Sequence, residues 1–207
     1  MADPKIGYHH GDLRAALIDA GLELTRVGGP EALTVREATR RVGVSPNAAY
    51  RHFADREALL GAVAMAIQDR VAARMLSPVR RRGSVETRAR NQLRAVGLGY
   101  IDFALDEPGW FRVAFFGSGV TEVLDNQTGT YVAPPYRALV EALDAMVNTG
   151  VLTPQRRDGS EWPCWSAVHG FAELVLHGPL RDTSRRDVDS LAQRTVDDII
   201  AGLSRQD

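Results

Sequence analysis

Hydrophobic positions recur every three or four residues along most of the 207-residue chain. The first such stripe runs from Leu13 to Val27 and stops at Gly28 and Gly29. Steps of three and four place side chains on one face of an α-helix, whereas strands alternate in steps of two. No segment shows convincing strand alternation. The pattern therefore predicts an all-α protein whose first helix ends at the two glycines.

Two short helices separated by a glycine turn are predicted next. In "TVRE", Thr34 can accept from the backbone three residues on while Glu37 reaches back, which is a capping box. That helix should end before Gly43. In "SPNAAYRHF", Ser45 is a candidate N-cap, and Pro46 takes the first helical position, where its missing N–H does no harm. A short helix, a glycine turn and a second short helix form a helix-turn-helix.

Longer amphipathic helices occupy the rest of the chain. Asp55 can cap a fourth helix that stops near Ser77 and Pro78, and the basic linker "SPVRRRGS" follows it. Further apolar stripes predict helices near residues 93–104, 136–147, 162–180 and 187–203. The chain is therefore expected to form a small helical head on a larger helical body.

Composition narrows the class of protein but does not name a function. Hydrophobic residues make up 44% and charged residues 25%, as in ordinary globular proteins, and the net charge is -1. Any case for nucleic acid must therefore rest on where the arginines lie. Cys164 is the single cysteine, which excludes an intramolecular disulfide and fits a reducing compartment. With no signal-peptide pattern and no 18-residue apolar run, we expect a cytoplasmic protein that does not bind a membrane.

The stretch after Pro46 has the chemistry of a helix that lies against DNA. Ala48 and Ala49 are small, which permits close approach to the duplex and to the preceding helix. Tyr50, Arg51 and His52 follow at once, and all three can donate to phosphate oxygens beside the major groove. The alternative is that Tyr50 and His52 are half-buried residues that hold the head together.

These residues resemble a known family. "GYHHGDLRAALIDAGLEL" and "ALTVREATRRVGVSPNAAYRHFADREALL" are similar to the DNA-binding head of TetR-family transcriptional regulators. "CWSAVHGFAELVL" resembles the Trp-His-Gly signature of one type of TetR C-terminal domain. The resemblance implies a helix-turn-helix DNA-binding domain over residues 1–54. It also implies a helical ligand-binding and dimerisation domain over residues 55–207, in which 55–76 form the connecting helix.

The resemblance implies roles for individual head residues. Thr34, Tyr50, His52 and Arg56 are expected to contact phosphates. Arg36 is a candidate for bidentate contact with guanine and Asn47 for contact with adenine, although both could be solvated. The full predicted DNA-binding set is Thr34, Arg36, Ser45, Pro46, Asn47, Tyr50, Arg51, His52 and Arg56. Lys5 and Tyr8 could form an arm in the adjacent groove or an ordinary frayed terminus.

The body is rich in aromatic residues, most of which must belong to the core. Ligand pockets in helical bundles are apolar and lined by aromatic rings, and the resemblance implies such a pocket. The predicted lining is Tyr100, Trp110, Phe111, Phe115, Tyr136, Trp165 and His169. The expected effector is a small apolar or aromatic molecule. The resemblance also implies a homodimer through residues 162–203 that binds a palindromic operator and acts as a repressor.

Other constellations carry weaker chemistry. His169, Glu173 and His177 recur at four-residue steps and could ligate a metal, but a polar stripe on a packed helix explains them as well. Cys164 lacks the orienting partners of a catalytic nucleophile. Arg80 to Arg82 fit a solvated linker better than a phosphate site. We therefore expect no catalytic site, no metal and no cofactor. The alternative is a helical-bundle enzyme or metal-binding protein with a helix-turn-helix head.

Overall fold

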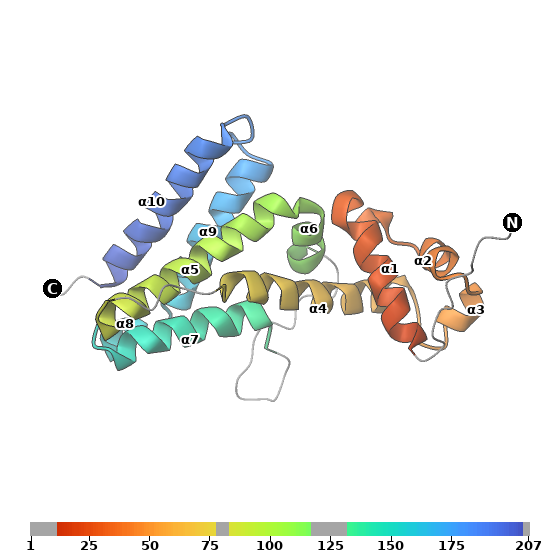
Figure 1. The fold of residues 1–207 in the computed structure, drawn as a ribbon, viewed down its shortest axis with the longest axis horizontal. Helices are drawn as coiled ribbons and strands as arrows, with labels where there is room; N and C mark the ends of the chain where they lie inside the picture. Colours follow the sequence, from red (N-terminus) through yellow and green to blue (C-terminus); the bar gives the residue numbers. More distant parts are fainter. Residues whose placement is uncertain (1–11, 78–82, 117–131, 205–207) are drawn as a thin grey trace, which may run out of the picture.

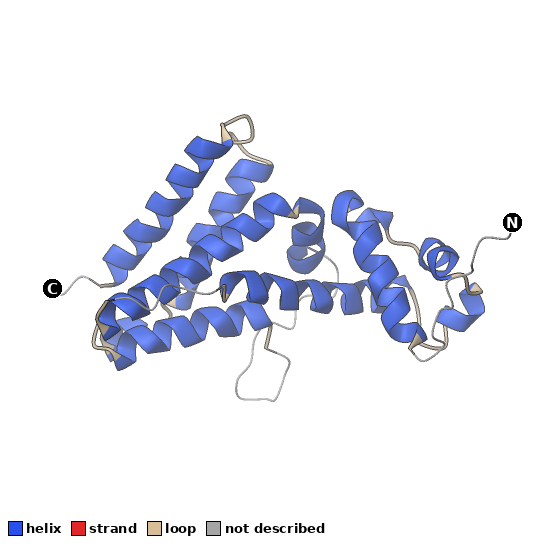
Figure 2. Cartoon of the chain, viewed as in Figure 1, coloured by secondary structure: helices blue, strands red, loops and turns tan. Residues whose placement is uncertain are grey.

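The computed structural model describes residues 12–77, 83–116 and 132–204, and these residues form helices and loops without a strand (Figures 1 and 2). This confirms the all-α prediction. The elements in chain order are α1 (Leu13–Gly28), the 3₁₀ turn η1 (Pro30–Ala32), α2 (Val35–Val42), α3 (Pro46–Ala49), α4 (Arg56–Met75), α5 (Val85–Asp106), α6 (Pro108–Phe116), α7 (Pro134–Asn148), α8 (Pro154–Arg157), α9 (Glu161–Leu176) and α10 (Arg185–Leu203).

Helices α1 to α3 lie together at one end of the molecule, and the long α4 leads from them into the body (Figure 1). The helix boundaries follow the signals read from the sequence. Thr34 Oγ1 accepts from the Glu37 amide at 3.1 Å, and Asp55 Oδ1 accepts from the Ala58 amide at 2.8 Å. Gly43 ends α2 with φ +78°, a left-handed conformation that glycine adopts without steric cost.

Helix α5 is the centre of the body, where it packs against α4, α7, α9 and α10. Its glycines permit two close approaches. A Cβ added at Gly99 would lie 2.7 Å from the carbonyl oxygen of Arg74 near the end of α4, and one at Gly97 would lie 3.1 Å from Val196 on α10. The end of α4 is therefore seated directly on the backbone of α5.

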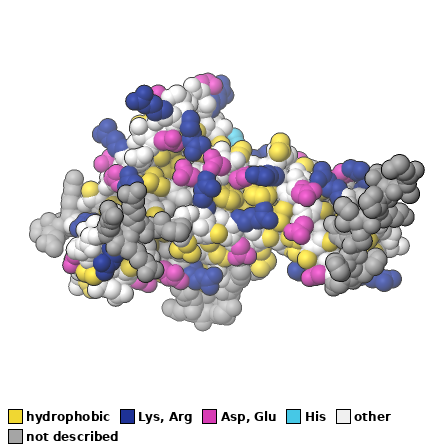
Figure 3. All heavy atoms as spheres, in the orientation of Figure 1, with side chains coloured by type: hydrophobic (Ala, Val, Ile, Leu, Met, Phe, Trp, Pro, Cys, Tyr) yellow, Lys and Arg dark blue, Asp and Glu magenta, His cyan; other side chains and the backbone are white. Residues whose placement is uncertain are grey.

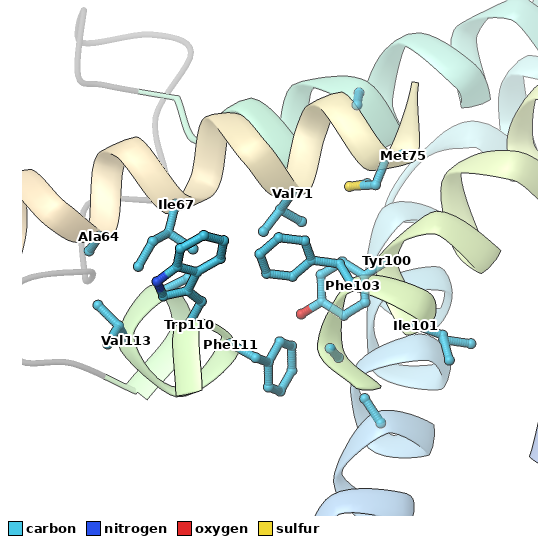
Figure 4. Close-up of a cluster of buried hydrophobic side chains, with 14 of the residues drawn as sticks. Ala64, Ile67, Val71, Met75, Tyr100, Ile101, Phe103, Trp110, Phe111 and Val113 are labelled. Carbon is cyan, nitrogen blue, oxygen red and sulfur yellow. The ribbon is translucent and has the colours of Figure 1, made fainter. Parts of the chain in front are cut away.

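Helix α6 joins the head to the body by packing on both α1 and α4. The buried Trp110 donates its indole N–H to the carbonyl of Leu22 at 2.8 Å. In Figure 4 the indole lies beside Ile67 of α4. Beside it, Glu107 accepts two hydrogen bonds from Arg26, at 2.7 and 2.5 Å. The end of α1 is thus held by both hydrogen bonds and packing.

Three local details differ from the sequence-based expectation. Val27 closes the predicted apolar stripe of α1 but is 93% exposed, because the helix turns this last position to the surface. Helix α9 ends at Leu176, four residues early, because Pro179 cannot continue a helix and disfavours helical geometry at Gly178. Neither α6 nor the short α8 has a counterpart among the predicted helices.

Candidate nucleic-acid interface and ligand cavity

The helix-turn-helix presents its predicted contact residues to the surface. Exposed positions at the start of α2 and along α3 and the following turn are Thr34, Arg36, Ser45, Pro46, Asn47, Tyr50, Arg51 and His52. Tyr50 is 53% exposed and His52 is exposed as well, so both side chains are accessible from the surface. Ser45 occupies the N-cap position of α3 without a side-chain capping bond. One face of the head therefore gathers hydroxyl, amide, imidazole and guanidinium groups.

Small and apolar residues beneath this face hold α3 close to α1 and α2. Ala49 is only 1% exposed, and Phe53, just after α3, is also buried. The guanidinium of Arg14 lies 5.3 Å from the centre of the Phe53 ring. A larger side chain at position 49 would push α3 outward, because a packed interior has no room for extra atoms.

Ion pairs distinguish the arginines of the head from one another. Arg40 donates to Glu37 through Nε at 2.9 Å and Nη2 at 2.6 Å, and this hydrogen bonding lowers the pKa of Glu37. Arg41 pairs with Glu23 at 3.0 Å. By contrast, the side chains of Arg36 and Arg51 make no ion pair within the described ranges. One of the two unpaired arginines lies in the first turn of α2, and the other lies just after α3.

Arg56 is placed differently from the other predicted phosphate contacts. Its Nε donates to the carbonyl of Leu33 at 2.7 Å, its Nη2 donates to the carbonyl of Pro30, and its Nη1 pairs with Glu57 at 2.5 Å. The guanidinium is therefore turned inward, onto the connection between α1 and α2. The guanidinium that was predicted to contact phosphate thus lies on two backbone carbonyls of the head.

The body contains a small cavity between α5, α7, α9, α10 and the end of α4. Its volume is about 30 Å³, and its lining is largely apolar, with Tyr100, Cys164 and Trp165 as the residues that carry a polar side-chain atom. Desolvation raises the pKa of the Cys164 thiol to about 11. The lining residues are Met75, Leu93, Val96, Gly97, Tyr100, Leu139, Cys164, Trp165, Ala167, Val168, Val196, Ile199 and Ile200. No carboxylate, ammonium or guanidinium group reaches the cavity from the described residues.

Two of the predicted pocket residues, Tyr100 and Trp165, line this cavity, and their rings are 5.5 Å apart. Tyr100 also begins an aromatic cluster that leads away from the cavity to α6. Its hydroxyl lies 2.8 Å from His169 Nδ1, and its ring lies 5.8 Å from Phe111 and 5.3 Å from Phe115. Burial raises the pKa of Tyr100 well above its ordinary value and lowers that of His169, so both groups are neutral at pH 7.

Trp110, which was predicted to line the pocket, lies between α1, α4 and α6 and does not line this cavity (Figure 4). Arg26 and Arg70 place their guanidinium carbons 5.2 and 4.6 Å from its ring centre. Phe111, Phe115, Tyr136 and His169 are outside the cavity lining as well. Tyr136 instead packs against Trp162 and Trp165, with ring centres 6.1 and 6.2 Å away.

Several lining residues were missed because they are ordinary members of apolar stripes. Leu93, Val96, Leu139, Val196 and Ile199 come from three helices and carry no local mark of a cavity. Only the packing of α5, α7 and α10 brings them together. The closest sequence signal for the cavity is an apolar stripe that contains small residues such as Gly97. The same pattern predicts closely packed helices, so it does not distinguish a cavity from ordinary packing.

The remaining candidate sites have structural explanations where the structure describes them. His169 bonds to Tyr100, and His177 Nδ1 lies 3.0 Å from Glu173 Oε2. Across the described ranges no group of three or more potential metal ligands comes together. Lys5, Tyr8 and Arg80 to Arg82 lie outside the described residues. The candidate sites that remain are therefore the face of the head and the cavity of the body.

Helices α9 and α10 both carry exposed apolar side chains. Trp162 and Leu174 on α9 are 46% and 45% exposed, and Leu191 on α10 is also exposed. A Cβ added at Gly170 would meet no atom within 4 Å.

On the face drawn in Figure 3, acidic and basic side chains are interspersed rather than separated into single-sign regions. None of the helices in the described ranges has the uninterrupted apolar length that a membrane span requires.

Comparisons with solved structures show the same fold. The chain is 24% identical to a Rhodococcus sp. RHA1 protein of unknown function, over 97% of this chain and 100% of that one, with a TM-score of 0.69. It is 22% identical to a TetR variant from Acinetobacter baumannii AYE in complex with minocycline, over 97% and 100%, with a TM-score of 0.63. A TetR-family regulator from Marinobacter aquaeolei VT8 is 20% identical over 90% and 94%, with a TM-score of 0.60.

Family comparisons cover both the head and the body. The family described as "Bacterial regulatory proteins, tetR family" matches residues 17–63, which span α1 to the first part of α4. The family described as "Tetracyclin repressor-like, C-terminal domain" matches residues 93–199. No curated protein matches the chain. Because the family models match both the helix-turn-helix head and the helical body, the chain belongs to the TetR family of ligand-responsive, DNA-binding transcriptional regulators and is not an enzyme.

Proposed function

We propose that this regulator is a repressor that leaves a palindromic operator when a small uncharged, apolar molecule enters the body cavity. One observation carries the proposal: α4 connects the two candidate sites. Its first residue, Arg56, lies against the α1–α2 connection, and its last residue, Met75, lines the cavity. A change in the cavity that moves the end of α4 therefore acts on the reading head.

This arrangement gives the two domains different roles. Residues 1–54 form the DNA-binding domain, and residues 55–207 form the ligand-binding and dimerisation domain, with 55–76 as the connecting helix. Thr34, Tyr50, Arg51 and His52 bind phosphates, which position the head on the duplex. Arg36 and Asn47 read base edges in the major groove. The protein acts in the cytoplasm, where its operator is accessible.

The effector class follows from the lining of the cavity. A charged ligand would lose its hydration without gaining a partner, because no described charged group reaches the lining. A volume of about 30 Å³ is also too small for an aromatic ring, since a cavity that binds benzene measures roughly 150 Å³. The effector must therefore widen the cavity, and this widening displaces α4 relative to α5.

Helix α6 offers a second route from the body to the head. Tyr100 contacts the cavity on one side and Phe111 and Phe115 of α6 on the other. The same helix holds α1 through Trp110. Because α6 packs on both α1 and α4, a shift of the aromatic cluster acts on the head in parallel with α4.

The dimer forms through α9 and α10, and members of this family act as dimers. Exposed apolar side chains at Trp162, Leu174 and Leu191 support this interface, because a stable monomer would leave them in water. The open space at Gly170 permits a second helix to approach closely. A two-fold dimer should place its heads on half-sites separated by one turn of the duplex, or a multiple of it, roughly 34 Å per turn.

The experiment begins with DNA that the purified protein selects from a random pool. We expect the selected sequences to contain an inverted repeat. Toluene and benzoate then form a matched pair of uncharged and charged probes, and operator affinity is measured with each. Toluene should weaken operator binding by about 5- to 150-fold, and operator should weaken toluene binding by the same factor. Equal responses to both probes, or selection without any consensus, would refute the proposal.

A further inference from the structure

The guanidinium of Arg56 makes its hydrogen bonds to groups of the head and of the start of α4. It donates to the carbonyls of Leu33, at 2.7 Å, and Pro30, and it also pairs with Glu57 at 2.5 Å. The two carbonyl oxygens belong to residues three apart, at the first residue of η1 and just after its end. A planar guanidinium matches two acceptors in this arrangement, whereas an ammonium group acts as a single point.

The stretch that Arg56 holds leads directly into the reading helices. Leu33 is fully buried, and the next residue, Thr34, caps α2. Helix α2 packs on α1 and α3, and α4 packs on α1. Arg56 is the first residue of α4, so its side chain joins that helix to the entrance of α2 without passing through α1. The angle between α4 and the α2–α3 pair therefore depends on this bond pair.

A phosphate contact by the same group would require it to leave both carbonyls. The side chain is 37% exposed, so water reaches part of it, but its Nε and Nη2 atoms point inward. Arg51 offers a contrast within the same head, because its exposed side chain makes no ion pair with a described residue. The two arginines are thus suited to different tasks.

We propose that Arg56 is a positioning residue that fixes the reading helices α2 and α3 relative to α4, and that it does not itself contact DNA. The inference rests on the proposed DNA-binding role of α2 and α3. It explains why an arginine at the first position of the connecting helix faces backward, onto η1. A movement of α4 is then transmitted to the start of α2, at Thr34, through the two hydrogen bonds from Arg56 to the carbonyls of Pro30 and Leu33. It does not require a phosphate group that both helices contact.

The test compares Arg56→Lys and Arg56→Ala with the matched pair Arg51→Lys and Arg51→Ala. The first measurement is amide hydrogen exchange of the free dimer, without DNA. Both Arg56 variants should speed exchange in residues 30–42 by roughly tenfold or more, the scale of a lost charge-assisted hydrogen bond, and leave α9 and α10 unchanged. Both Arg51 variants should exchange like the unsubstituted protein. Unchanged exchange in residues 30–42 of Arg56→Ala would overturn the proposal.

The second measurement is the salt dependence of operator binding. Arg56→Lys should bind operator as weakly as Arg56→Ala, because neither side chain can donate to both carbonyls as the planar guanidinium does. It should also keep the slope of log affinity against log salt. Arg51→Ala should lower that slope by about 0.9, and Arg51→Lys should restore it. Restored affinity in Arg56→Lys, or a slope reduced by about one in either Arg56 variant, would assign Arg56 to phosphate and overturn the proposal.

The two measurements separate this inference from the proposed function. If the unsubstituted protein selects no operator, the proposed repressor function fails, while the exchange experiment still decides the role of Arg56 in the free head. If operator binding is specific but residues 30–42 exchange normally in the Arg56 variants, the positioning role alone is wrong.

Discussion

The contact between Gly109 of α6 and the end of α1 gives a sharp test of how the head is fixed to the body. A Cβ added at Gly109 would lie 2.2 Å from the carbonyl oxygen of Arg26 and 2.5 Å from that of Thr25. Both atoms belong to the backbone, so no side-chain rotation can relieve the overlap. The substitution Gly109→Ala must therefore push α6 away from α1 by roughly 1 Å, because packed interiors lack free space.

The expected cost follows from the contacts beside Gly109. Inserting a methyl group into a packed site typically costs about 1–3 kcal/mol. The displacement also strains the Trp110 indole bond to the Leu22 carbonyl, which measures 2.8 Å. At about 2–4 °C per kcal/mol for a chain of this size, Gly109→Ala should lower the Tm by roughly 2–12 °C.

Gly61→Ala is the matched control. Gly61 lies within α4, and a Cβ added there would meet no atom within 4 Å. Alanine is favoured over glycine inside a helix by roughly 0.5–1 kcal/mol, so this variant should be slightly more stable than the unsubstituted protein.

Thermal unfolding of all three proteins at one protomer concentration gives the comparison, since the Tm of a dimer depends on concentration. Urea unfolding of the same samples gives the difference in free energy directly. If Gly109→Ala is as stable as the unsubstituted protein while Gly61→Ala gains stability, the close seating of α6 on α1 is refuted.

Three further outcomes are expected. Leu174→Glu should shift sedimentation at micromolar concentration toward the monomer, whereas Met65→Glu on α4, where the side chain is 49% exposed, should remain dimeric; equal dissociation of both would count against the α9–α10 interface. With its pKa raised to about 11, the Cys164 thiol should react with a disulfide reagent at pH 8 at least about a hundredfold more slowly in the native protein than after unfolding, and rates within a few-fold of each other would contradict its burial in the cavity. Burial lowers the pKa of His169, so the unfolded chain binds the proton first as pH falls below about 6.5, and stability is lost there. His169→Gln should therefore lose less stability between pH 7 and pH 5 in urea unfolding, and parallel losses would argue against a neutral, half-buried His169.

The helices of the head could be predicted because their signals act over four residues or fewer. The Thr34 hydroxyl meets the Glu37 amide, Gly43 adopts the left-handed turn, and Pro46 takes the first position of α3. Each signal depends only on backbone groups within a few residues, and groups that close in sequence are always close in space. The exposed Asn47 on α3, and Tyr50, Arg51 and His52 in the turn directly after it, are then placed by the position of this short helix.

The aromatic residues of the body could be recognised but not assigned to individual places. Trp110 and Phe111 are adjacent in sequence, yet helix geometry sends them to different faces of α6. The indole of Trp110 meets a carbonyl 88 residues away on α1, while Phe111 joins the ring of Tyr100. An apolar stripe predicts that such residues are buried, and it carries no information about which helix covers them.

The amino-acid sequence by itself determined the all-helical fold, the helix-turn-helix and the chemistry of its exposed face, because caps, glycine turns and three- and four-residue steps are local. The tertiary structure decided which groups meet across long separations. It turned Arg56 inward onto Leu33, 23 residues away, and it assembled the cavity from stripes on α5, α7, α9 and α10. Both outcomes depend on how rigid helices cross, and crossing is set by the close approach of backbones at positions such as Gly99 and Gly109 rather than by any neighbour in sequence.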